Sequence, residues 1–476
     1  MHRSYQLEEL QTPLNALSIQ GDASFVRVST DTRNLRSGDL FIALVGPNFN
    51  GNQYLQQAKD KGAVAAVVSE LQSIDLPQLL VSDTRLALGQ IGGLNRQAFS
   101  RPLVAITGSS GKTSVKEMLA SILRTQGDVL ATKGNLNNDI GVPLTLLELT
   151  DKQTFAVIEL GASGLGEIAY TTGLAKPDVA ILNNAGGAHL EGFGSLQGVV
   201  KAKGEIFQGL SSEGVAIVNL DDPHSATWLQ QLKTTKSLSF SLTSAHADLF
   251  ASHLDKAANG CYGFVLNSHQ GQVEIQLQVL GRHMAANAMA AAAAASALGI
   301  SLNDIRQGLQ NFCGVPGRLA VVQTSEGAKV IDDSYNANPD SVKAAVEVLA
   351  DLPGTRVLVL GNMGELGSDA LELHRQIGGF AAQRGIDLLL VVGALASEAA
   401  SEFKRQGGKS EVFKDNQSLA AWLKGRVNQE MVVLVKGSRS AAMETVVSAL
   451  TASTSKTGDL TAQVLTNKDS STEGKC

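Results

Sequence analysis

A glycine-rich segment with a lysine and hydroxyl side chains, TGSSGKTS at 107–114, is the strongest chemical signal in the sequence. It follows the apolar run LVAIT and precedes the amphipathic stretch VKEMLASILRTQG, which predicts a strand, a glycine loop and a helix in this order. Backbone N–H groups of such a loop and of the following helix bind phosphate oxygens. We expect Lys112 to hold the β- and γ-phosphates of a nucleotide and Thr113 to offer its hydroxyl to Mg²⁺.

This loop differs from the common G-x-x-x-x-G-K-[ST] pattern, because position 106 is Ile and the first usable glycine is Gly108. The shortening argues against an ordinary kinase or GTPase. A glycine turn with a surface lysine is the alternative, and the strand and helix on either side of the loop disfavour it.

Three further side chains follow strand-like segments and are candidates for the same site. Glu159 ends the apolar run FAVIEL, where the carboxyl edge of an α/β sheet binds ligands, and it suits Mg²⁺; a solvated carboxylate at a turn is the alternative. His189 lies in a glycine-rich loop, where an isolated histidine is more often exposed than a ligand. Lys201 and Lys203 are two positions apart on a predicted helix, so only one can face a site. Such a lysine can ligate Mg²⁺ only as a carbamate, and the residues alone favour two solvated lysines.

A second polar cluster follows the apolar run KVI near residue 330. Asp333, Asn336 and Asn338 have no local structural explanation there, whereas Asp340 or Ser341 fits a helix N-cap. The loops GNMGELG at 361–367 and KGSRS at 436–440 also follow apolar runs. Three strand ends at one sheet edge predict a surface that faces a ligand.

The elements that carry these residues predict an α/β protein of three domains. Alternating and apolar segments at 25–33, 39–44 and 64–69 indicate a small N-terminal α/β domain, and 86–99 a linking helix. Buried-strand candidates at 103–107, 155–160, 178–184 and 214–220 indicate a central parallel sheet, with an antiparallel insertion at about 238–280 and a buried Ala-rich helix at 285–297. Four more strand-like runs indicate a C-terminal Rossmann-like domain. The predicted boundaries are 1–84, 100–314 and 315–452, followed by a polar tail, 453–476, that we expect to be disordered.

Composition excludes several classes of protein. A net charge of −6 and a pI near 5.8 give no basic field for binding nucleic acid. The cysteines Cys261, Cys313 and Cys476 are too far apart in the sequence for a zinc knuckle or a disulfide framework, which favours a cytoplasmic protein. The N-terminus lacks the apolar core of a signal peptide, and no run has the roughly 20 apolar residues of a membrane span.

Seven segments together resemble the Mur ligase family over essentially the whole chain up to about residue 450. They are TGSSGKTS, GNLNNDIGVP at 134–143, ELGAS at 159–163, NNAGGAHLEGFGS at 183–195, AKGEIF at 202–207, GVPGR at 314–318 and DDSYNANPDS at 332–341. The details, GNLNND and DDSYNANPDS above all, are similar to the branch that adds D-alanyl-D-alanine.

The resemblance implies a role for each matching residue. Thr113, Glu159, His189 and a carbamylated Lys203 would surround Mg²⁺, and Lys112, Glu159, His189 and Lys203 would form the catalytic set. Ser29, Asp31 and Arg33 would hold the UDP end of the substrate, and Asn135, Asn137 and Asn138 would also contact substrate. The residues implied to bind ATP are Gly108, Ser109, Ser110, Gly111, Lys112, Thr113, Ser114, His283, Asn287, Arg318, Asn336 and Asn338.

The resemblance further implies an ATP-dependent amide ligase with ATP and Mg²⁺ as cofactors. Its partners would be UDP-N-acetylmuramoyl-tripeptide and D-alanyl-D-alanine, and a cytoplasmic monomer is expected. A carboxylate is a poor electrophile, so ATP would first convert it to an acyl phosphate.

Three alternatives stay open. A sister ligase, such as the tripeptide-forming enzyme or folylpolyglutamate synthetase, would share the loop and the acyl phosphate but use another acceptor. A switch or transport ATPase would turn over ATP without an amino acceptor, and a non-catalytic module would only bind the nucleotide.

Overall fold

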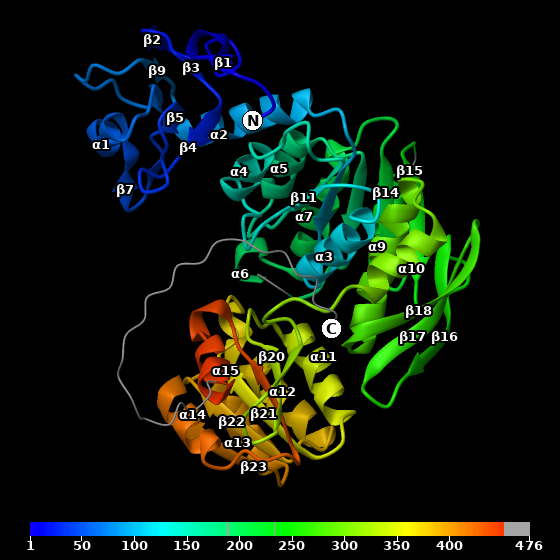
Figure 1. The fold of residues 1–476 in the computed structure, drawn as a ribbon. Coiled ribbons are helices and arrows are strands. Elements are labelled where there is room, and N and C mark those ends of the chain that lie inside the picture. The colour runs from blue at the N-terminus through cyan, green and yellow to red at the C-terminus, as the bar shows by residue number, and fades with distance from the viewer. Residues whose placement is uncertain (188–189, 233, 452–476) are drawn as a thin grey trace, which may run out of the picture. The chain divides into compact units, whose positions relative to one another are not determined.

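The structure is a computed structural model that describes residues 1–187, 190–232 and 234–451. The predicted tail, 453–476, lies outside the described residues. The chain divides into two compact units. The first comprises Met1–Lys256, Tyr262–Leu277 and Arg282–Phe312, and the second Ala257–Cys261, Gln278–Gly281 and the described chain from Cys313 onward. Each unit is built on α/β layers, and the mixed α/β class predicted from the sequence is confirmed (Figure 1).

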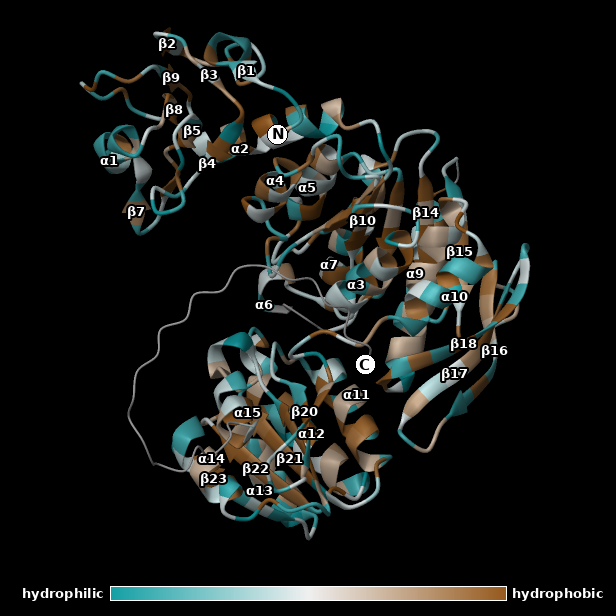
Figure 2. Ribbon diagram, in the orientation of Figure 1, coloured by the Kyte–Doolittle hydropathy of each residue, from teal (hydrophilic) through white to brown (hydrophobic). Residues whose placement is uncertain are grey.

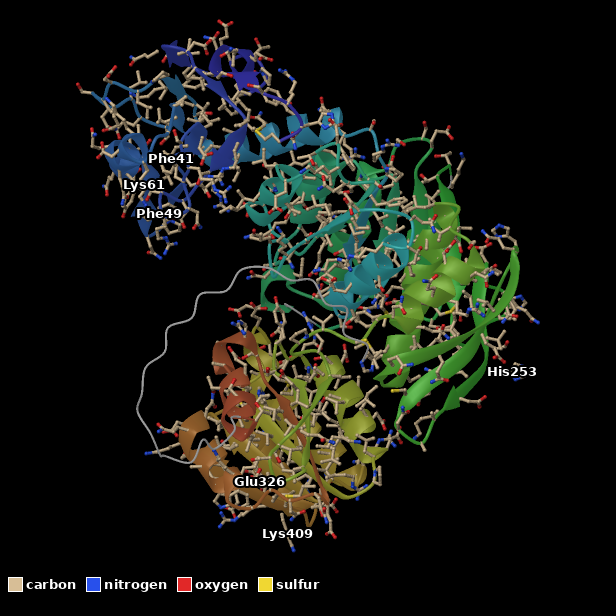
Figure 3. The ribbon with its side chains drawn as sticks, in the orientation of Figure 1. Phe41, Phe49, Lys61, His253, Glu326 and Lys409 are labelled. Atoms are coloured by element: carbon tan, nitrogen blue, oxygen red, sulfur yellow. The ribbon has the colours of Figure 1, made fainter. Side chains whose placement is uncertain are left out.

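The N-terminal part of the first unit is a five-stranded sheet in the order β2-β9-β8-β5-β4, parallel except for β2. Phe41 on β5 is buried, whereas Phe49 on the small β6–β7 hairpin is exposed (Figure 3). The strands and helices of this part are β1 Tyr5–Gln6, β2 Ser18–Gln20, β3 Ser24–Phe25, β4 Arg27–Ser29, β5 Asp39–Ile42, β6 Val45–Gly46, β7 Phe49–Asn50, α1 Leu55–Asp60, β8 Ala65–Val68, β9 Gln78–Leu80 and α2 Thr84–Ala98. Asp83 caps α2 by accepting from the N–H groups of Arg85 and Leu86.

The central sheet of the first unit has nine strands in the order β11-β12-β10-β13-β14-β15-β16-β17-β18. Its first strands are the apolar runs expected for a parallel sheet buried on both faces, as their hydropathy in Figure 2 also shows. The strands are β10 Leu103–Thr107, β11 Val129–Ala131, β12 Phe155–Glu159, β13 Val179–Leu182, β14 Val215–Asn219, β15 Lys236–Ser241, β16 Leu249–Lys256, β17 Cys261–Ser268 and β18 Gly271–Leu280.

The predicted antiparallel insertion at 238–280 is only partly right. β15 pairs in parallel with β14, and β16 pairs in parallel with β15, so antiparallel pairing begins at β16 and β17. Side chains alternate between the two faces in either kind of pairing, so alternation in the sequence does not set strand direction. A bulge near His253, whose φ is +50°, breaks the register of β16, and this side chain is exposed at the rim (Figure 3).

Helices cover both faces of the central sheet. α3 packs against α9 and α10 on one face, while α4, α5, α7 and α8 contribute to the core cluster on the other face. The Ala-rich segment forms α9 and is buried, as predicted. The helices are α3 Lys112–Leu123, α4 Gly141–Leu146, α5 Glu167–Ala175, α6 Leu190–Phe193, α7 Leu196–Gly204, α8 Ser225–Gln231, α9 Arg282–Ala297 and α10 Leu302–Gln310. No helix among the described residues is both long and apolar enough to span a membrane.

The second unit is a six-stranded sheet in the order β19-β20-β24-β21-β22-β23, parallel except for β19. One core cluster packs α11, α12 and α13 on one face, and another packs α14 and α15 on the opposite face. The elements are β19 Ala320–Gln323, β20 Lys329–Asp333, α11 Pro339–Ala350, β21 Thr355–Gly361, α12 Ala370–Gln383, β22 Leu388–Val392, α13 Ala396–Arg405, β23 Lys409–Phe413, α14 Asn416–Lys424, β24 Met431–Lys436 and α15 Glu444–Thr451.

A buried histidine fixes the loop after β21. His374 on α12 is fully buried, its Nε2 accepts a 2.9 Å hydrogen bond from the Met363 N–H, and its Nδ1 lies 2.6 Å from the Ala370 carbonyl oxygen. Only a neutral imidazole can accept at Nε2. Burial lowers the pKa of His374, which is consistent with this neutral form.

We therefore expect the second unit to lose stability as the pH falls below about 6.5, the ordinary histidine pKa. Below this pH the imidazole of His374 is protonated in the unfolded chain but stays neutral in the folded protein, which favours unfolding. His374→Gln keeps an acceptor for Met363 but does not titrate, so its stability should vary less with pH. The protein has two tryptophans, and in a Trp228→Phe background urea unfolding followed by Trp422 fluorescence reports on the second unit alone. Equal pH dependence in both proteins would contradict the assignment, and the exposed His269→Gln is the matched control.

Candidate active site

The glycine loop predicted to bind phosphate joins β10 to α3. β10 ends at Thr107, and Gly111 is the N-cap of α3 with a φ of +79°. A Cβ on Gly111 would lie 2.4 Å from Asn287 Oδ1 and 2.6 Å from Asn183 Nδ2, so both the backbone angle and the space require glycine. The loop therefore presents its N–H groups and the first turn of α3 at the carboxyl edge of the sheet, as a phosphate site needs.

Two asparagines at the end of β13 brace this loop. Asn183 Nδ2 donates to the Ser110 carbonyl and to Asn287 Oδ1, at 3.1 and 3.0 Å. Asn184 accepts from the Ser110 N–H through Oδ1 at 2.9 Å and from the Ser109 N–H through its carbonyl at 3.1 Å. These asparagines lie in the segment NNAGGAHLEGFGS, but their sequence context predicts no role for them. Their only local signal is a polar pair directly after a buried strand.

Glu159, Thr113 and Asn137 converge beside the loop. Thr113 Oγ1 donates to Glu159 Oε2 at 3.0 Å, and Asn137 Nδ2 donates to Glu159 Oε1 at 2.9 Å. The Glu159 side chain is buried, and Lys112 Nζ lies over the loop, where it donates to the Gly108 carbonyl at 2.6 Å. A hydroxyl and a carboxylate side by side are the hard oxygen donors that Mg²⁺ prefers. The structure thus brings together two of the four predicted metal ligands.

Of the two lysines on α7, Lys203 is buried and Lys201 is exposed, so only one faces inward, as expected. Burial, reinforced by the positive charge of Lys112, lowers the pKa of Lys203 to about 7. Its Nζ lies 5.4 Å from the centre of the Phe193 ring. The fourth predicted ligand, His189, lies outside the described residues. Within the described part of the chain, no three His, Cys, Asp or Glu side chains are grouped to hold a metal ion.

The remaining candidates of the first unit lie in three places: on α9, before α4, and at the end of β4 and just after it. On α9, Asn287 is buried against the loop and His283 is half-buried. Before α4, Asn135 is exposed, while Asn138 Oδ1 accepts from the Gly141 N–H at 2.8 Å and so supports the start of that helix. After β4, Arg33 pairs with Asp31 at 2.7 Å, and this guanidinium lowers the pKa of Asp31. Ser29 donates to the Asp31 carbonyl at 3.0 Å.

The polar strand ends of the second unit meet, as predicted. Lys436 Nζ, at the end of β24, donates to Asp333 Oδ2 at 2.6 Å and to the Asn336 carbonyl at 2.9 Å. The Ser438 N–H donates to the Asn362 carbonyl at 2.9 Å. Arg318 lies over the Tyr335 ring, 4.1 Å from its centre.

The helix cap expected at Asp340 or Ser341 is Asn338 instead. Its Oδ1 accepts from the Ser341 N–H at 2.8 Å, and Ser341 Oγ accepts from the Asn338 N–H at 3.0 Å. Pro339 at the first helical position favours this start. Asn338 thus has a local partner in Ser341, whereas Asp333 is paired with the distant Lys436.

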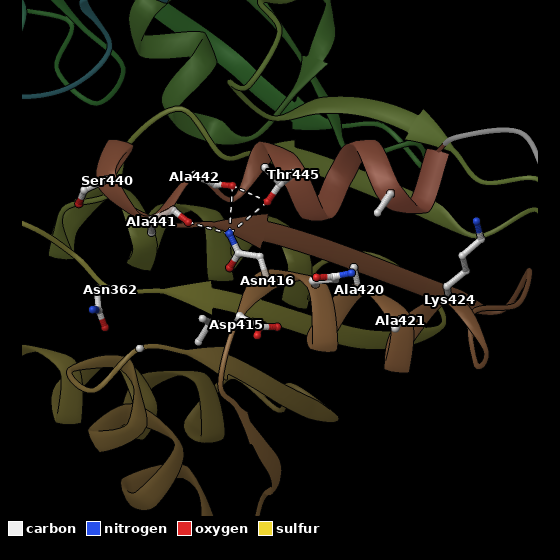
Figure 4. Close-up of a pocket in the computed structure, with 14 residues that line it drawn as sticks. Asn362, Asp415, Asn416, Ala420, Ala421, Lys424, Ser440, Ala441, Ala442 and Thr445 are labelled. Carbon is white, nitrogen blue, oxygen red and sulfur yellow. Dashed lines mark hydrogen bonds between the residues drawn. The ribbon is translucent and has the colours of Figure 1, made fainter.

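A cavity of about 1020 Å³ opens in the second unit between α14 and α15 and reaches the ends of β21 and β22 (Figure 4). Asn416 bridges its walls by donating to the Ala441 and Ala442 carbonyls at 2.8 and 3.1 Å. Alanine side chains make up much of the lining.

A glycine loop braced at a helix N-terminus, with a lysine, a hydroxyl and a carboxylate beside it, defines a site for the phosphates of a nucleotide. Residues 106–295 match the model of the Mur ligase middle domain, and residues 317–439 that of the Mur ligase, glutamate ligase domain. The chain belongs to the Mur ligase family.

Individual relatives are similar over nearly the whole chain. UDP-N-acetylmuramoyl-tripeptide–D-alanyl-D-alanine ligase of Escherichia coli (strain K12) is 47% identical, over 94% of this chain and 98% of the relative. The ligase of the same name from Bacillus subtilis (strain 168) is 34% identical, over 88% and 92%. A crystal structure of MurF from Acinetobacter baumannii superposes with a TM-score of 0.88 at 38% identity, covering 94% of this chain and 99% of that one. MurF ligase from Thermotoga maritima, in complex with ADP, has a TM-score of 0.79 at 28% identity, covering 89% and 96%.

Gly111→Ala is expected to weaken ATP binding about tenfold or more. An alanine held in the left-handed region costs about 1–3 kcal/mol, and its Cβ must also displace Asn183 and Asn287, so the loop shifts. About 1.4 kcal/mol corresponds to tenfold in affinity. Calorimetric titration with ATP measures the effect. Gly299→Ala is the control, because Gly299 has a φ of +76° and no atom lies within 4 Å of the position that its Cβ would take. Equal affinities of the two variants would contradict the role of the loop.

Proposed function

We propose that this protein is an ATP-dependent, ADP-forming amide ligase that joins D-alanyl-D-alanine to UDP-N-acetylmuramoyl-tripeptide. The product is UDP-N-acetylmuramoyl-pentapeptide, a precursor of peptidoglycan. The observation that carries the proposal is the convergence of Thr113 and Glu159 beside the phosphate loop of a Mur ligase middle domain. The acceptor and the nucleotide substrate follow from the name shared by relatives up to 47% identical over 94% of the chain.

ATP is proposed to bind to the loop 108–114 with His283 and Asn287, and to Arg318, Asn336 and Asn338. The braced loop and the position of Asn287 against Gly111 support the first part. Thr113 and Glu159 fit Mg²⁺, and we add His189 and Lys203 as ligands. Bound there, Mg²⁺ would offset the charge of the nucleotide phosphates.

Lys203 can serve as a ligand only as a carbamate. Its buried amine, with a pKa of about 7, is largely neutral at slightly alkaline pH, and a neutral amine is the form that attacks carbon dioxide. The nitrogen forms a bond to carbon and loses a proton to solvent. An anionic carbamate then replaces a buried cation, which suits a cation site better.

The proposed reaction activates the substrate carboxylate first. The carboxylate attacks the γ-phosphorus of ATP, ADP leaves, and an acyl phosphate forms, with Lys112 stabilising the negative charge on the phosphates. The amine of D-alanyl-D-alanine attacks the acyl carbon, the tetrahedral intermediate expels phosphate, and the nitrogen loses its extra proton. The acyl phosphate must be kept from water until the amine attacks.

We assign the UDP end of the substrate to an N-terminal domain of residues 1–84, through Ser29, Asp31 and Arg33. The linking helix predicted at 86–99 is α2, Thr84–Ala98, and it leads to the proposed central ATP-binding domain, 100–314. The proposed C-terminal domain is 315–452. Asn135, Asn137 and Asn138 are proposed to contact the substrate near Glu159, since Asn137 already hydrogen-bonds this carboxylate. We place the protein in the cytoplasm, as a monomer.

Phosphate release from ATP should depend on both UDP-N-acetylmuramoyl-tripeptide and D-alanyl-D-alanine, with a pentapeptide detected by mass. Lys112→Ala should abolish release, because the charge on the transferred phosphoryl group loses its cation, while the fold is retained in circular dichroism. A fully active Lys112→Ala protein would exclude the phosphate site. Release without the dipeptide would indicate an ATPase, and no release with either diaminopimelate- or lysine-containing tripeptide would indicate a sister ligase.

Lys203→Ala and Lys201→Ala form a matched pair on one helix. The first should lower kcat by at least about 10–100-fold, since loss of even a partner of a metal ligand typically costs this much in metal affinity or activity, and the second should change it little. A carbamate signal in ¹³C NMR with labelled bicarbonate should be present in wild type and in Lys201→Ala but absent in Lys203→Ala. Equal activities of the two variants would refute the role of Lys203.

A further inference from the structure

A second lysine on α3 is buried and has no part in the mechanism above. Lys116 lies one turn after Lys112 and is 2% exposed. An ammonium group in such a position is costly unless it is paired and hydrogen-bonded. Lys116 Nζ donates to the Thr132 carbonyl and lies 3.0 Å from Glu117 Oε1. The buried charge of Lys116 is therefore compensated by the Thr132 carbonyl and by Glu117.

Thr132 connects this lysine to the candidate metal site. It follows β11, the edge strand of the central sheet, and is fully buried. Its N–H donates to the Val157 carbonyl at 3.0 Å, and its Oγ1 accepts from the Glu159 N–H at 2.9 Å. The backbone of Glu159 is thus held by Thr132, whose own carbonyl is held by Lys116.

The contacts close a ring between α3 and β12. From α3, Thr113 donates to the Glu159 carboxylate, while Lys116 reaches the same residue through Thr132. β11 has three residues and, in the part of the chain that the structure describes, it pairs only with β12. The hydrogen bond from Lys116 links the end of β11 to α3, the helix that follows the phosphate loop.

We propose that Lys116 is a positioning residue that sets the affinity of the nucleotide site for its divalent cation, by fixing Thr132 and hence Glu159 opposite Thr113. The inference rests on the cation site of the proposed function. Lys116 acts through the backbone of Glu159 and touches no substrate. Its loss should therefore raise the cation concentration required, with little change in the KM for D-alanyl-D-alanine.

Lys116→Met removes the donor at similar volume, and Thr132→Val removes the acceptor for the Glu159 N–H but keeps the carbonyl. Binding of Mn²⁺ in the presence of ADP, followed by the EPR signal of free Mn²⁺, measures cation affinity without turnover. We expect each variant to bind Mn²⁺ about tenfold more weakly, as is typical when a partner of a ligand is lost. The double variant should be no weaker than the single ones, because both break one chain of contacts. Lys116→Arg, which keeps a cationic donor, should recover part of the affinity, and the exposed Lys201→Met should match wild type.

Wild-type Mn²⁺ affinity in both Lys116→Met and Thr132→Val, even with a lowered melting temperature, would overturn the inference and leave Lys116 a structural residue. Additive losses in the double variant would overturn it as well. If Lys116→Met does not fold, Lys116→Arg and Thr132→Val decide the question. Absence of dipeptide-dependent turnover in wild type would refute the proposed function, but the Mn²⁺ experiment with ADP would still test Lys116.

Discussion

The parallel pairing of β10 with β12 and β13 is the constraint on which the site depends. Ile106 pairs with Glu159, and Thr107 pairs with Leu182, so the three strands end almost level. Parallel strands that end level open their following loops on one edge of the sheet. The phosphate loop, Glu159 and the asparagine pair therefore meet there, although they come from three separate parts of the sequence. A shift of one residue would turn Glu159 toward the opposite face of the sheet.

The sequence predicts what is local in this arrangement. The apolar runs of β10, β12, β13 and β14 and the loop before α3 are each readable within about ten residues, because burial on both faces demands continuous apolar strands. Contacts between distant residues are not readable in this way. Asn183 meets Asn287 across 104 positions, and Lys436 meets Asp333 across 103. No pattern near either residue specifies its partner.

Two further features could not be predicted from the sequence, although they involve residues that are closer together in the chain. Glu205, in the AKGEIF segment, accepts from the Gly166 N–H at 2.9 Å and the Ala169 N–H at 3.1 Å, so a carboxylate from one helical segment caps the start of α5. The spacing of residues in this segment draws attention to its lysines and gives no sign of the role of Glu205. Likewise, the parallel direction of β16 follows from where the chain returns to the sheet and not from its alternating residues.

Three buried lysines show how a protein interior treats a cation. Lys436 is paired with Asp333, and Lys116 is bound by the Thr132 carbonyl and lies near Glu117. Burial, reinforced by the positive charge of Lys112, lowers the pKa of Lys203 to about 7. The first two arrangements compensate the charge, whereas the third reduces the cost by favouring the neutral amine. The charge of Lys112 disfavours a second cation at this position and would attract an anionic derivative of Lys203. The phosphate loop lacks the first glycine of the common pattern. Asn183 and Asn184, directly after β13, hydrogen-bond the Ser110 backbone, so the neighbouring strand helps to fix the shape of this loop.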